Sequence, residues 1–353
     1  MNAIVQTPVA VPSAERMQSY HMSMGAGLDG LLLKQHEVPT PGPHEVLLRV
    51  RAVSLNYREL MIMLQGRYPL PVKADVIGVS DGAGEVIALG HGVSRVKLGD
   101  RVIASIFPRW IDGPFSIERA AQLGGSLDGM LTEYAVLHED ALVHIPEHLS
   151  WQEAATLPCA AVTAWNALTG GHALKAGDNV LVLGSGSVSL FALQFAKACG
   201  ARVIATTSSD DKAVRLRELG ADDVINYRSQ PDWSAEVRRL SGGIGVQHVV
   251  EVGGGSTMPQ SLKSVCLGGE IAFVGTAAGG ESMIDANAIF ASGAVIRAVA
   301  AGHRTQLTEV TRLMTEHRIK PVIDRVFAFD QAPAAFAYYA NQRRFGKVVI
   351  SVA

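Results

Sequence analysis

The sequence predicts a doubly wound α/β domain with a parallel sheet, joined to a second, mainly β part. The chain has 353 residues, more than one typical domain contains. Hydrophobic residues make up 48% and charged residues 18%, which provides for a buried core and argues against disorder. After Pro146, Gly- and Pro-punctuated β-like runs give way to alternating apolar strands and helical patterns.

Short β-like runs characterise the N-terminal part. Examples are residues 45–53 (EVLLRVRAV), 84–89 (GEVIAL) and 101–104 (RVIA), the last entered through the turn LGD. Such runs, separated by Gly and Pro, are typical of an antiparallel sheet or barrel with irregular connections. We expect the first dozen or so residues to form a loose extension.

From Asn179 onward, short apolar strands alternate with helical patterns. The strands read VLVLG, RVIAT, DVINY, HVVEVG, IAFVG and VIRAV. Their hydrophobicity is continuous rather than alternating, which predicts strands buried on both faces, as in a parallel sheet. Strand–helix alternation with short links favours a doubly wound domain. A helix-rich tail follows, and FGKVVISV predicts a last strand.

Composition also bounds the partners and the compartment. The formal net charge is −2 and no Lys/Arg cluster breaks the balance, so we expect neither nucleic acid nor a membrane surface as a partner. The sequence has neither a secretory signal pattern nor an apolar run of the roughly 20 residues that span a bilayer. Three thinly spread cysteines do not describe a disulfide framework. These features predict a cytoplasmic protein.

The clearest chemical signal is the segment VLVLGSGSVSLFALQFAKACG. Gly184 and Gly186 follow a predicted strand and open a helix that begins with Ser187 and Val188. A pyrophosphate needs close backbone approach and N–H groups at a helix N-terminus, which side chains at the two glycine positions would obstruct. The third position of the G-x-G-x-x-G pattern is Ser189, a departure from Gly or Ala. An ordinary tight turn is the alternative, but the α/β setting favours a dinucleotide site.

The residues after the next strand bear on the choice of coenzyme. No acidic residue stands at the strand end, where one would bind both ribose hydroxyls of NAD. Hydroxyls and a cation, which accept a 2′-phosphate, are present instead at Thr207, Ser208 and Lys212, with Tyr227 after the third strand. We therefore predict NADPH, with NADH less favoured.

Two acidic residues weaken this prediction. Asp210 and Asp211 follow closely, although acidic residues are favoured in the first turn of a helix, where they can face solvent. The alternative is that all these side chains belong to a surface loop and either coenzyme binds.

At this point the chain resembles a known family across nearly its whole length. The matching stretches are PTPGPHEVLLRVRAVSLNYREL, GRYPLP, DGAGEVIALG, VKLGDRV, LTEYAV, EAATLPCAAVTAWNAL, the coenzyme loop, LGADDVINY, GGEIAFVG and FGKVVI. They resemble the medium-chain dehydrogenase/reductase superfamily, and most of all its zinc-independent quinone oxidoreductase-like branch, some of whose members are named alcohol dehydrogenases.

The resemblance implies a domain arrangement. Superfamily members have a GroES-like, mainly β catalytic domain built from both chain ends and an inserted Rossmann domain, with coenzyme and substrate in the cleft between them. The corresponding ranges here are 1–147 with 300–353 for the catalytic domain and 148–299 for the Rossmann domain. Many members are dimers or tetramers, so the resemblance also implies a homodimer or homotetramer.

The positions that hold catalytic zinc in zinc-dependent relatives carry other residues here. Matched one by one, they fall at Asn56, at the pair Ser80–Asp81, and at Cys159. One thiolate with Asn and Ser cannot replace the usual set of three protein ligands. The four-cysteine structural-zinc lobe is absent from the sequence as well. We therefore predict no zinc, and interpret Cys159 as a buried thiol rather than a ligand or nucleophile.

Without a Lewis acid, the reaction must suit acceptors that are already electrophilic, such as quinones or α,β-unsaturated carbonyls. Tyr57 is the candidate proton donor, because it lies in the segment that faces the nicotinamide in the resembling family. Water as the proton source, with Tyr57 only shaping the pocket wall, is the alternative. Asn56 is a candidate to hydrogen-bond substrate or ribose.

Further coenzyme contacts are expected at four positions. Thr163 and Lys347 lie in stretches that match the family, CAAVTAW and FGKVVI. Gly253 and Gly275 stand at strand carboxyl ends, where ligands bind in open α/β sheets.

Three functions stay open at this level. The leading one is an NADPH-dependent oxidoreductase that transfers hydride to quinones or α,β-unsaturated carbonyls without catalytic zinc. The second is a zinc-free alcohol dehydrogenase or carbonyl reductase that uses a side-chain acid. The third is a non-catalytic NADPH-binding protein.

Overall fold

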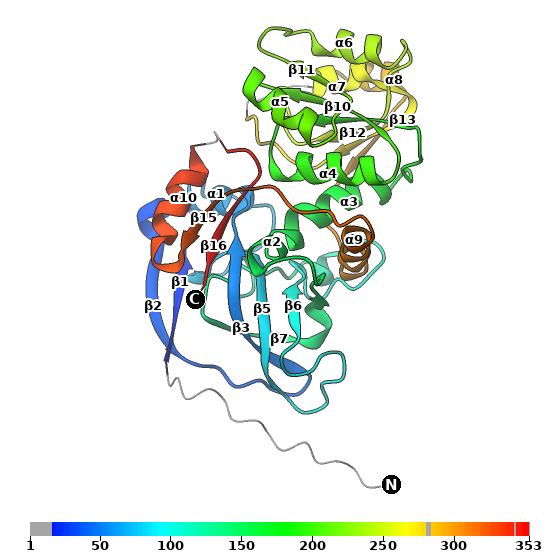
Figure 1. Cartoon of the computed structure of the whole chain (residues 1–353). Coiled ribbons are helices and arrows are strands. Elements are labelled where there is room, and N and C mark those ends of the chain that lie inside the picture. Colours follow the sequence, from blue (N-terminus) through cyan, green and yellow to red (C-terminus); the bar gives the residue numbers. More distant parts are fainter. Residues whose placement is uncertain (1–15, 280–283, 342–343, 353) are drawn as a thin grey trace, which may run out of the picture.

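The computed structural model describes residues 16–279, 284–341 and 344–352, and two sheets dominate it (Figure 1). The predicted N-terminal extension lies outside these residues. One sheet is parallel and is covered by helices, and the other is built largely from antiparallel strands. The predicted fold class is confirmed.

All neighbouring strands of the six-stranded sheet run parallel, in the order β11-β10-β9-β12-β13-β14. These are the six predicted strands, at β9 (Asn179–Leu183), β10 (Arg202–Thr207), β11 (Asp223–Asn226), β12 (Val246–Glu251), β13 (Val265–Phe273) and β14 (Val295–Ala298). The order reverses between β9 and β12, so the first and fourth strands lie side by side. In doubly wound sheets, ligands bind at the carboxyl end of the strands at this switch point.

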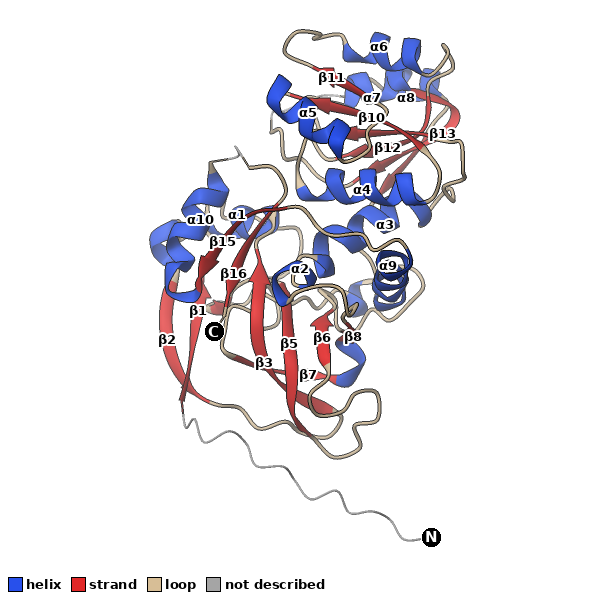
Figure 2. Ribbon diagram, in the orientation of Figure 1, coloured by secondary structure: helices blue, strands red, loops and turns tan. Residues whose placement is uncertain are grey.

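Helices cover both faces of the parallel sheet (Figure 2). Side chains of a strand alternate between faces, so in β9 Val180 and Val182 pack in one core while Leu181 and Leu183 pack in another. The first core contains side chains of α3 (Val162–Thr169), α4 (Ser187–Ala198) and α5 (Asp210–Glu218). The second contains side chains of α6 (Trp233–Leu240), α7 (Met258–Ser264) and α8 (Ala286–Ser292).

The other large sheet joins the two ends of the chain. Its order is β15-β16-β3-β5-β6-β8, with β7 also paired to β3. The strands are β3 (Glu45–Ser54), β5 (Asp81–Leu89), β6 (Arg101–Ala104), β7 (Tyr134–His138), β8 (Leu142–His144), β15 (Ile323–Ala328) and β16 (Lys347–Ser351). β16 runs antiparallel to β3, so the last strand lies beside an early one (Figure 1). The domain boundaries predicted at 147/148 and 299/300, between the catalytic and Rossmann domains, stay a prediction.

The remaining elements surround this sheet. A small sheet of order β2-β1-β4 comprises β1 (Arg16–Met22), β2 (Leu32–Glu37) and β4 (Val76–Ile77). The other helices are α1 (Tyr57–Met63), α2 (Trp151–Ala154), α9 (Arg304–Glu316) and α10 (Ala332–Ala340). Short 3-10 turns occupy 28–30, 117–119, 139–141 and 329–331, and a π-helical turn occupies 157–161. Within the described residues, no helix is long and apolar enough to cross a membrane.

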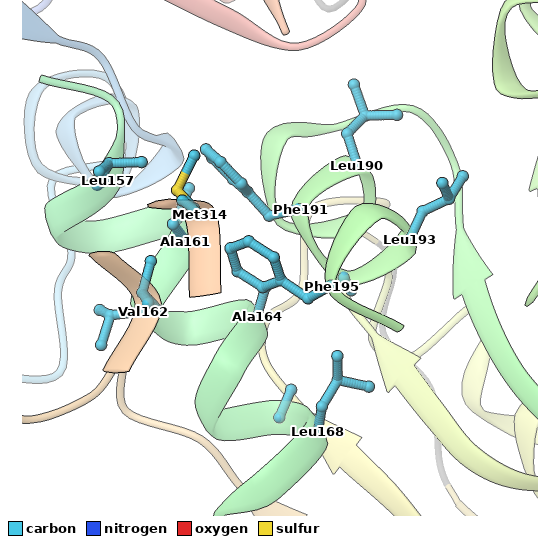
Figure 3. Close-up of a cluster of buried hydrophobic side chains, with 14 of the residues drawn as sticks. Leu157, Ala161, Val162, Ala164, Leu168, Leu190, Phe191, Leu193, Phe195 and Met314 are labelled. Carbon is cyan, nitrogen blue, oxygen red and sulfur yellow. The ribbon is translucent and has the colours of Figure 1, made fainter. Parts of the chain in front are cut away.

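One hydrophobic core connects the two sheets. It runs from Ala52 and Ala83 of the seven-stranded sheet, through the 157–168 segment, to Val180 of the parallel sheet. Figure 3 shows its centre, where Phe191 and Phe195 of α4 face α3 and Met314 of α9 lies close by. Because apolar burial stabilises by about 25 cal/mol per Å², this shared core holds both sheets against the connecting helices.

Candidate coenzyme and substrate site

The turn after β9 leaves open space at both of its glycines. Gly184 has a φ of +73°, a conformation that residues with a Cβ rarely adopt. A Cβ built at Gly184 or Gly186 would meet no atom within 4 Å. The Ser189 hydroxyl donates to the carbonyl oxygen of Leu183 at 2.7 Å and ties α4 to β9. A small hydroxyl residue at the third motif position is therefore explained by helix–strand packing.

Both glycines line a pocket of about 180 Å³. Seven residues predicted for the site surround it: Tyr57, Gly184, Gly186, Thr207, Ser208, Lys212 and Tyr227. Ser185, Ala277 and Arg344 complete the lining. The volume is below the roughly 300–1,000 Å³ of a pocket that encloses a drug-sized ligand, so this pocket covers only part of a dinucleotide.

In the part of the chain that the structure describes, one hydroxyl of the pocket lacks a partner, and one ammonium has only a long hydrogen bond. The buried Thr207 Oγ1 has no hydrogen-bond partner among the described residues. The ammonium of Lys212 lies 3.4 Å from the carbonyl oxygen of Arg344. Burial, followed by the positive charge of Arg344, lowers the pKa of Lys212. A buried hydroxyl without a partner and a desolvated cation are costly unless a ligand satisfies them.

Among the residues that the structure describes, no acidic side chain lines this pocket. Asp210 and Asp211 lie exposed in the first turn of α5, where Asp210 accepts a hydrogen bond from the Asn226 amide at 2.9 Å. Their position in the helix is the one the sequence predicted. The carboxylates that weakened the NADPH prediction therefore stand outside the pocket wall.

Arg344 is a pocket residue that sequence reasoning missed. Its guanidinium stacks over the Tyr339 ring at 3.7 Å and donates to the Tyr339 carbonyl oxygen at 2.6 Å. Nearby, Arg215 of α5 lies 3.8 Å from the ring centroid of Phe345. The only local signal was the basic residue shortly before FGKVVI. Its place opposite the glycine turn depends on how the C-terminal tail crosses back between the two sheets.

The start of α1 holds the two predicted catalytic residues. Tyr57 lines the pocket, and its hydroxyl oxygen accepts a hydrogen bond from Gln65 Nε2 at 3.0 Å. Among the described residues no acceptor is paired with the Tyr57 O–H, so the phenol retains a donor. Asn56 precedes it, and the Asn56 backbone N–H donates to Glu59 Oε2 at 2.7 Å, which caps the helix. Asn56 is buried and does not line the pocket.

Other predicted contacts lie outside the pocket lining. Ser187 and Val188 are half-buried in the first turn of α4. Thr163 is buried, and its hydroxyl donates to the Cys159 carbonyl oxygen at 2.6 Å. Gly275 follows β13, and a Cβ there would only touch the Val252 carbonyl oxygen at 3.7 Å. Coenzyme contacts at these four residues stay predictions.

The loop after β12 has an internal anchor that the sequence did not reveal. Gly253 and Gly254 donate their N–H groups to Oε1 of the buried Glu251, at 2.7 and 3.0 Å. A Cβ at Gly253 would meet the Thr257 hydroxyl at 2.4 Å. Packing alone therefore requires a glycine at this position, and a coenzyme contact of Gly253 stays a prediction.

Comparison with known proteins agrees with this arrangement. Residues 42–147 match the family model of the alcohol dehydrogenase GroES-like domain, and residues 187–316 match that of zinc-binding dehydrogenases. A zinc-type alcohol dehydrogenase-like protein of Schizosaccharomyces pombe is 42% identical over 93% of this chain and 96% of its own. A quinone oxidoreductase of Pseudomonas aeruginosa is 30% identical over 92% of this chain and 96% of its own.

A crystal structure of a putative alcohol dehydrogenase from Sinorhizobium meliloti is 39% identical, with a TM-score of 0.88 over 96% of this chain and 99% of that one. The chain belongs to the medium-chain dehydrogenase/reductase superfamily. It is an oxidoreductase of this type, and the family is nucleotide-dependent.

The family name raises the question of zinc, and the residues at the expected position answer it. Asn56, Ser80 and Asp81 do converge, with Asn56 Nδ2 3.5 Å from Ser80 Oγ and Ser80 Oγ 3.1 Å from Asp81 Oδ1. The Lys347 ammonium stands among them, within hydrogen-bond distance of Asn56 Oδ1 and Asp81 Oδ2, at 2.7 and 3.2 Å. A second buried ion pair lies beside the Lys347–Asp81 pair: Arg58 Nη1 is 3.0 Å from Glu59 Oε1.

This set does not fit a catalytic zinc. Two buried cations already balance the two buried carboxylates, so a divalent ion would add uncompensated charge. Burial, followed by the negative charge of Asp81, raises the pKa of Cys159 to about 12. Across the described ranges, no group of three or more His, Cys, Asp or Glu side chains could hold a metal ion.

Lys347, predicted to contact the coenzyme, is bonded within the chain. Its side chain is 1% exposed, and its three N–H donors are matched by Leu55 O, Asn56 Oδ1 and Asp81 Oδ2. An ammonium has three donors, so this arrangement leaves none for a coenzyme phosphate. Lys347 thus contacts residues of the catalytic part, and its coenzyme contact stays a prediction.

Proposed function

We propose that this protein is an NADPH-dependent oxidoreductase that transfers hydride to quinones or α,β-unsaturated carbonyls without catalytic zinc. The observation that carries the proposal is the pocket itself. Open space at Gly184 and Gly186 adjoins a wall of hydroxyls and cations, in which the described part of the chain places no acidic side chain. That combination suits a dinucleotide with a 2′-phosphate.

The residues that would hold the coenzyme divide by chemistry. The backbone at Gly184–Gly186 and the N-terminus of α4 suit the pyrophosphate. Thr207, Ser208, Lys212, Tyr227 and Arg344 suit the 2′-phosphate, because they offer hydroxyl and cationic donors. A bound 2′-phosphate would give Thr207 a partner and would relieve the repulsion between Lys212 and the neighbouring arginines.

NADPH, when bound, supplies a hydride, and the acceptor then needs one proton to complete its reduction. Tyr57 is the proposed proton donor, because its hydroxyl lines the pocket and retains its hydrogen for donation. Water is the alternative source. Since the metal-position residues do not supply a Lewis acid, the acceptor must be electrophilic by itself, which quinones and α,β-unsaturated carbonyls are.

A second candidate function is a zinc-free alcohol dehydrogenase or carbonyl reductase. It is favoured by the similarity to proteins named alcohol dehydrogenases. In that case a side-chain acid such as Tyr57 must polarise an unactivated carbonyl, a harder task than reduction of a quinone.

We also propose a homodimer or homotetramer in the cytoplasm. The edge strand β14 ends the parallel sheet, and exposed apolar side chains gather around it, including Leu267 (80% exposed), Phe290 (89% exposed), Val295 and Ile296. An unpaired edge with exposed apolar side chains favours association with another chain. Three free cysteines fit a reducing compartment. Light scattering coupled to gel filtration measures the oligomer directly.

The test of function is a coenzyme-oxidation screen. NADPH and NADH are each offered with quinones, enones and saturated aldehydes, while fluorescence titration measures coenzyme affinity separately. We expect NADPH-dependent turnover with quinones or enones. Turnover of saturated aldehydes and alcohols alone would favour the second function. Tight NADPH binding without turnover of any acceptor class would identify a non-catalytic binding protein.

A further inference from the structure

In the seven-stranded sheet, the pairing registers bring together the end of β3, the start of β5 and the strand β16. Ser54, at the end of β3, is paired with Asp81, at the start of β5. Ser54 is also paired with Val349 of β16. Because side chains two residues apart point to the same face of a strand, Lys347 lies on the side of Val349, next to the chain that continues from Ser54 to Asn56.

At this junction the Lys347 ammonium is buried and fully bonded. It donates to the Leu55 carbonyl oxygen at 2.9 Å, to Asn56 Oδ1 at 2.7 Å and to Asp81 Oδ2 at 3.2 Å. The Ser54 hydroxyl contributes a further bond to Asp81 Oδ2 at 3.0 Å. The charge is therefore held in one place rather than free to sample the pocket.

This contact fixes the orientation of the Asn56 amide. An ammonium can only donate, so the amide oxygen, and not the amide nitrogen, must face Lys347. The Nδ2 group is thereby turned away from Lys347 and makes a long contact of 3.5 Å with Ser80 Oγ. Asn56 immediately precedes Tyr57, which lines the pocket. The Asn56 amide is therefore buried one residue before a pocket residue, and its Nδ2 has only a long contact to Ser80 Oγ.

We propose that Lys347 is a positioning residue: it orients Asn56 so that Nδ2 donates to the acceptor oxygen as negative charge develops there. The inference rests on the proposed reductase function. It assigns the polarising task to an amide held by a buried ammonium, at the position where zinc-dependent relatives place a metal. A preoriented donor in a site with little water stabilises developing charge more than the same donor does in water.

The experiment compares variants that keep the fold and alter only this contact. Lys347→Met alone leaves Asp81 buried without its partner, so the double variant Lys347→Met/Asp81→Asn, which removes both charges, accompanies it. Asn56→Ala removes the oriented amide itself. Lys347→Arg tests rescue by another cation, and Lys197→Met, which breaks an exposed ion pair with Asp222, is the matched lysine control.

Three quantities are measured on each variant: the melting temperature, the NADPH Kd by fluorescence, and kcat with a strongly electrophilic quinone and a weaker enone. We expect the double variant and Asn56→Ala to lose kcat with the enone by at least about tenfold and with the quinone by less. Their NADPH Kd should stay within about twofold of the native value. Lys347→Arg should recover part of the loss, and Lys197→Met should change nothing.

Two results would overturn the role of Lys347. One is a folded double variant with native kcat on both acceptors. The other is an equal loss on both acceptors together with weaker NADPH binding, which a merely structural role would produce. Absence of turnover in the native protein would overturn the proposed function and, with it, the role of Lys347. This outcome is distinguished from failure of the Lys347 role alone because it is seen before any substitution is made.

Discussion

The two polar regions beside α1 have opposite character. Around Lys347 every charge has a buried partner, the cations balance the carboxylates, and the donors of the ammonium are all used. Around Gly184 the glycines face open space. Within the described ranges, the Thr207 hydroxyl has no hydrogen-bond partner and the pocket wall contains cations but no acidic side chain. Since buried polar groups are normally satisfied, we interpret the first region as balanced in charge and the second as open to a ligand.

The first prediction tests the region of paired charges around Lys347. Asp81→Asn removes one member of a buried ion pair and leaves the Lys347 charge without its carboxylate. We expect the free energy of unfolding to fall by about 3–5 kcal/mol, because breaking a buried pair exposes the full desolvation cost of the remaining charge. Denaturant unfolding measures it. An unchanged stability would mean that the network is not held together by these charges.

The second prediction tests the pocket around Gly184 at Gly186, where the pyrophosphate is proposed to approach the backbone. Gly186 has φ −75°, so valine is tolerated by the backbone, yet its side chain would occupy the space where a Cβ now meets no atom. Gly186→Val should raise the NADPH Kd by about 100-fold or more with little change in melting temperature. Fluorescence titration checks the affinity, and native-like binding would show that the pyrophosphate lies elsewhere.

The third prediction separates the two coenzymes. Lys212→Gln should weaken NADPH by about 10- to 100-fold, because a hydrogen bond to a charged group contributes about 1.5–3 kcal/mol, and should leave NADH unaffected. Arg217→Gln is the matched control, since Arg217 is an exposed cation of the same helix that does not line the pocket. Equal losses for NADPH and NADH would contradict a 2′-phosphate contact.

The fourth prediction concerns pH. Burial and the neighbouring Arg344 lower the pKa of Lys212 below its ordinary 10.5. The 2′-phosphate is ionised above about pH 7, so of this phosphate and the lysine only the lysine changes charge on the alkaline side. NADPH affinity should therefore fall as the pH rises from about 7 to about 10, and NADH affinity should not. In Lys212→Gln this difference between the coenzymes should disappear.

The smallest effect is expected at Thr207. Thr207→Val removes a buried hydroxyl that has no partner, so stability should change by less than about 1 kcal/mol or improve. NADPH affinity should fall by about 2- to 10-fold, the value of one neutral hydrogen bond. A marked loss of stability would show that the hydroxyl already has a structural role, and the region would then be less open than its geometry indicates.

Much of this arrangement could be predicted from the sequence, for identifiable reasons. The six strands of the parallel sheet are continuous apolar runs, and the glycine turn has a local backbone requirement, so both are readable along the chain. Six of the seven predicted pocket residues followed from the same logic, because strand ends of a doubly wound sheet meet at one edge, whereas Tyr57 followed from the family resemblance. The residues at the zinc positions of relatives were identified through the resemblance, and the absence of zinc stays a prediction.

The residues that escaped prediction depend on tertiary contacts between distant segments. Arg344 reaches the pocket only because the C-terminal tail returns beside α5. Glu251 organises the loop after β12 through bonds that no local pattern announces. Lys347 was expected at the coenzyme, but the register of β16 with β3 carries it to Asn56 and Asp81.

The most direct test of the account is turnover at a known metal content. The native protein is dialysed against a strong chelator, its zinc is measured by mass spectrometry, and NADPH oxidation with a quinone or an enone is followed on the same sample. We predict undiminished turnover with zinc well below one atom per chain. Turnover that disappears with the metal and returns in proportion to added zinc would contradict the interpretation of the Lys347 region as balanced in charge without it.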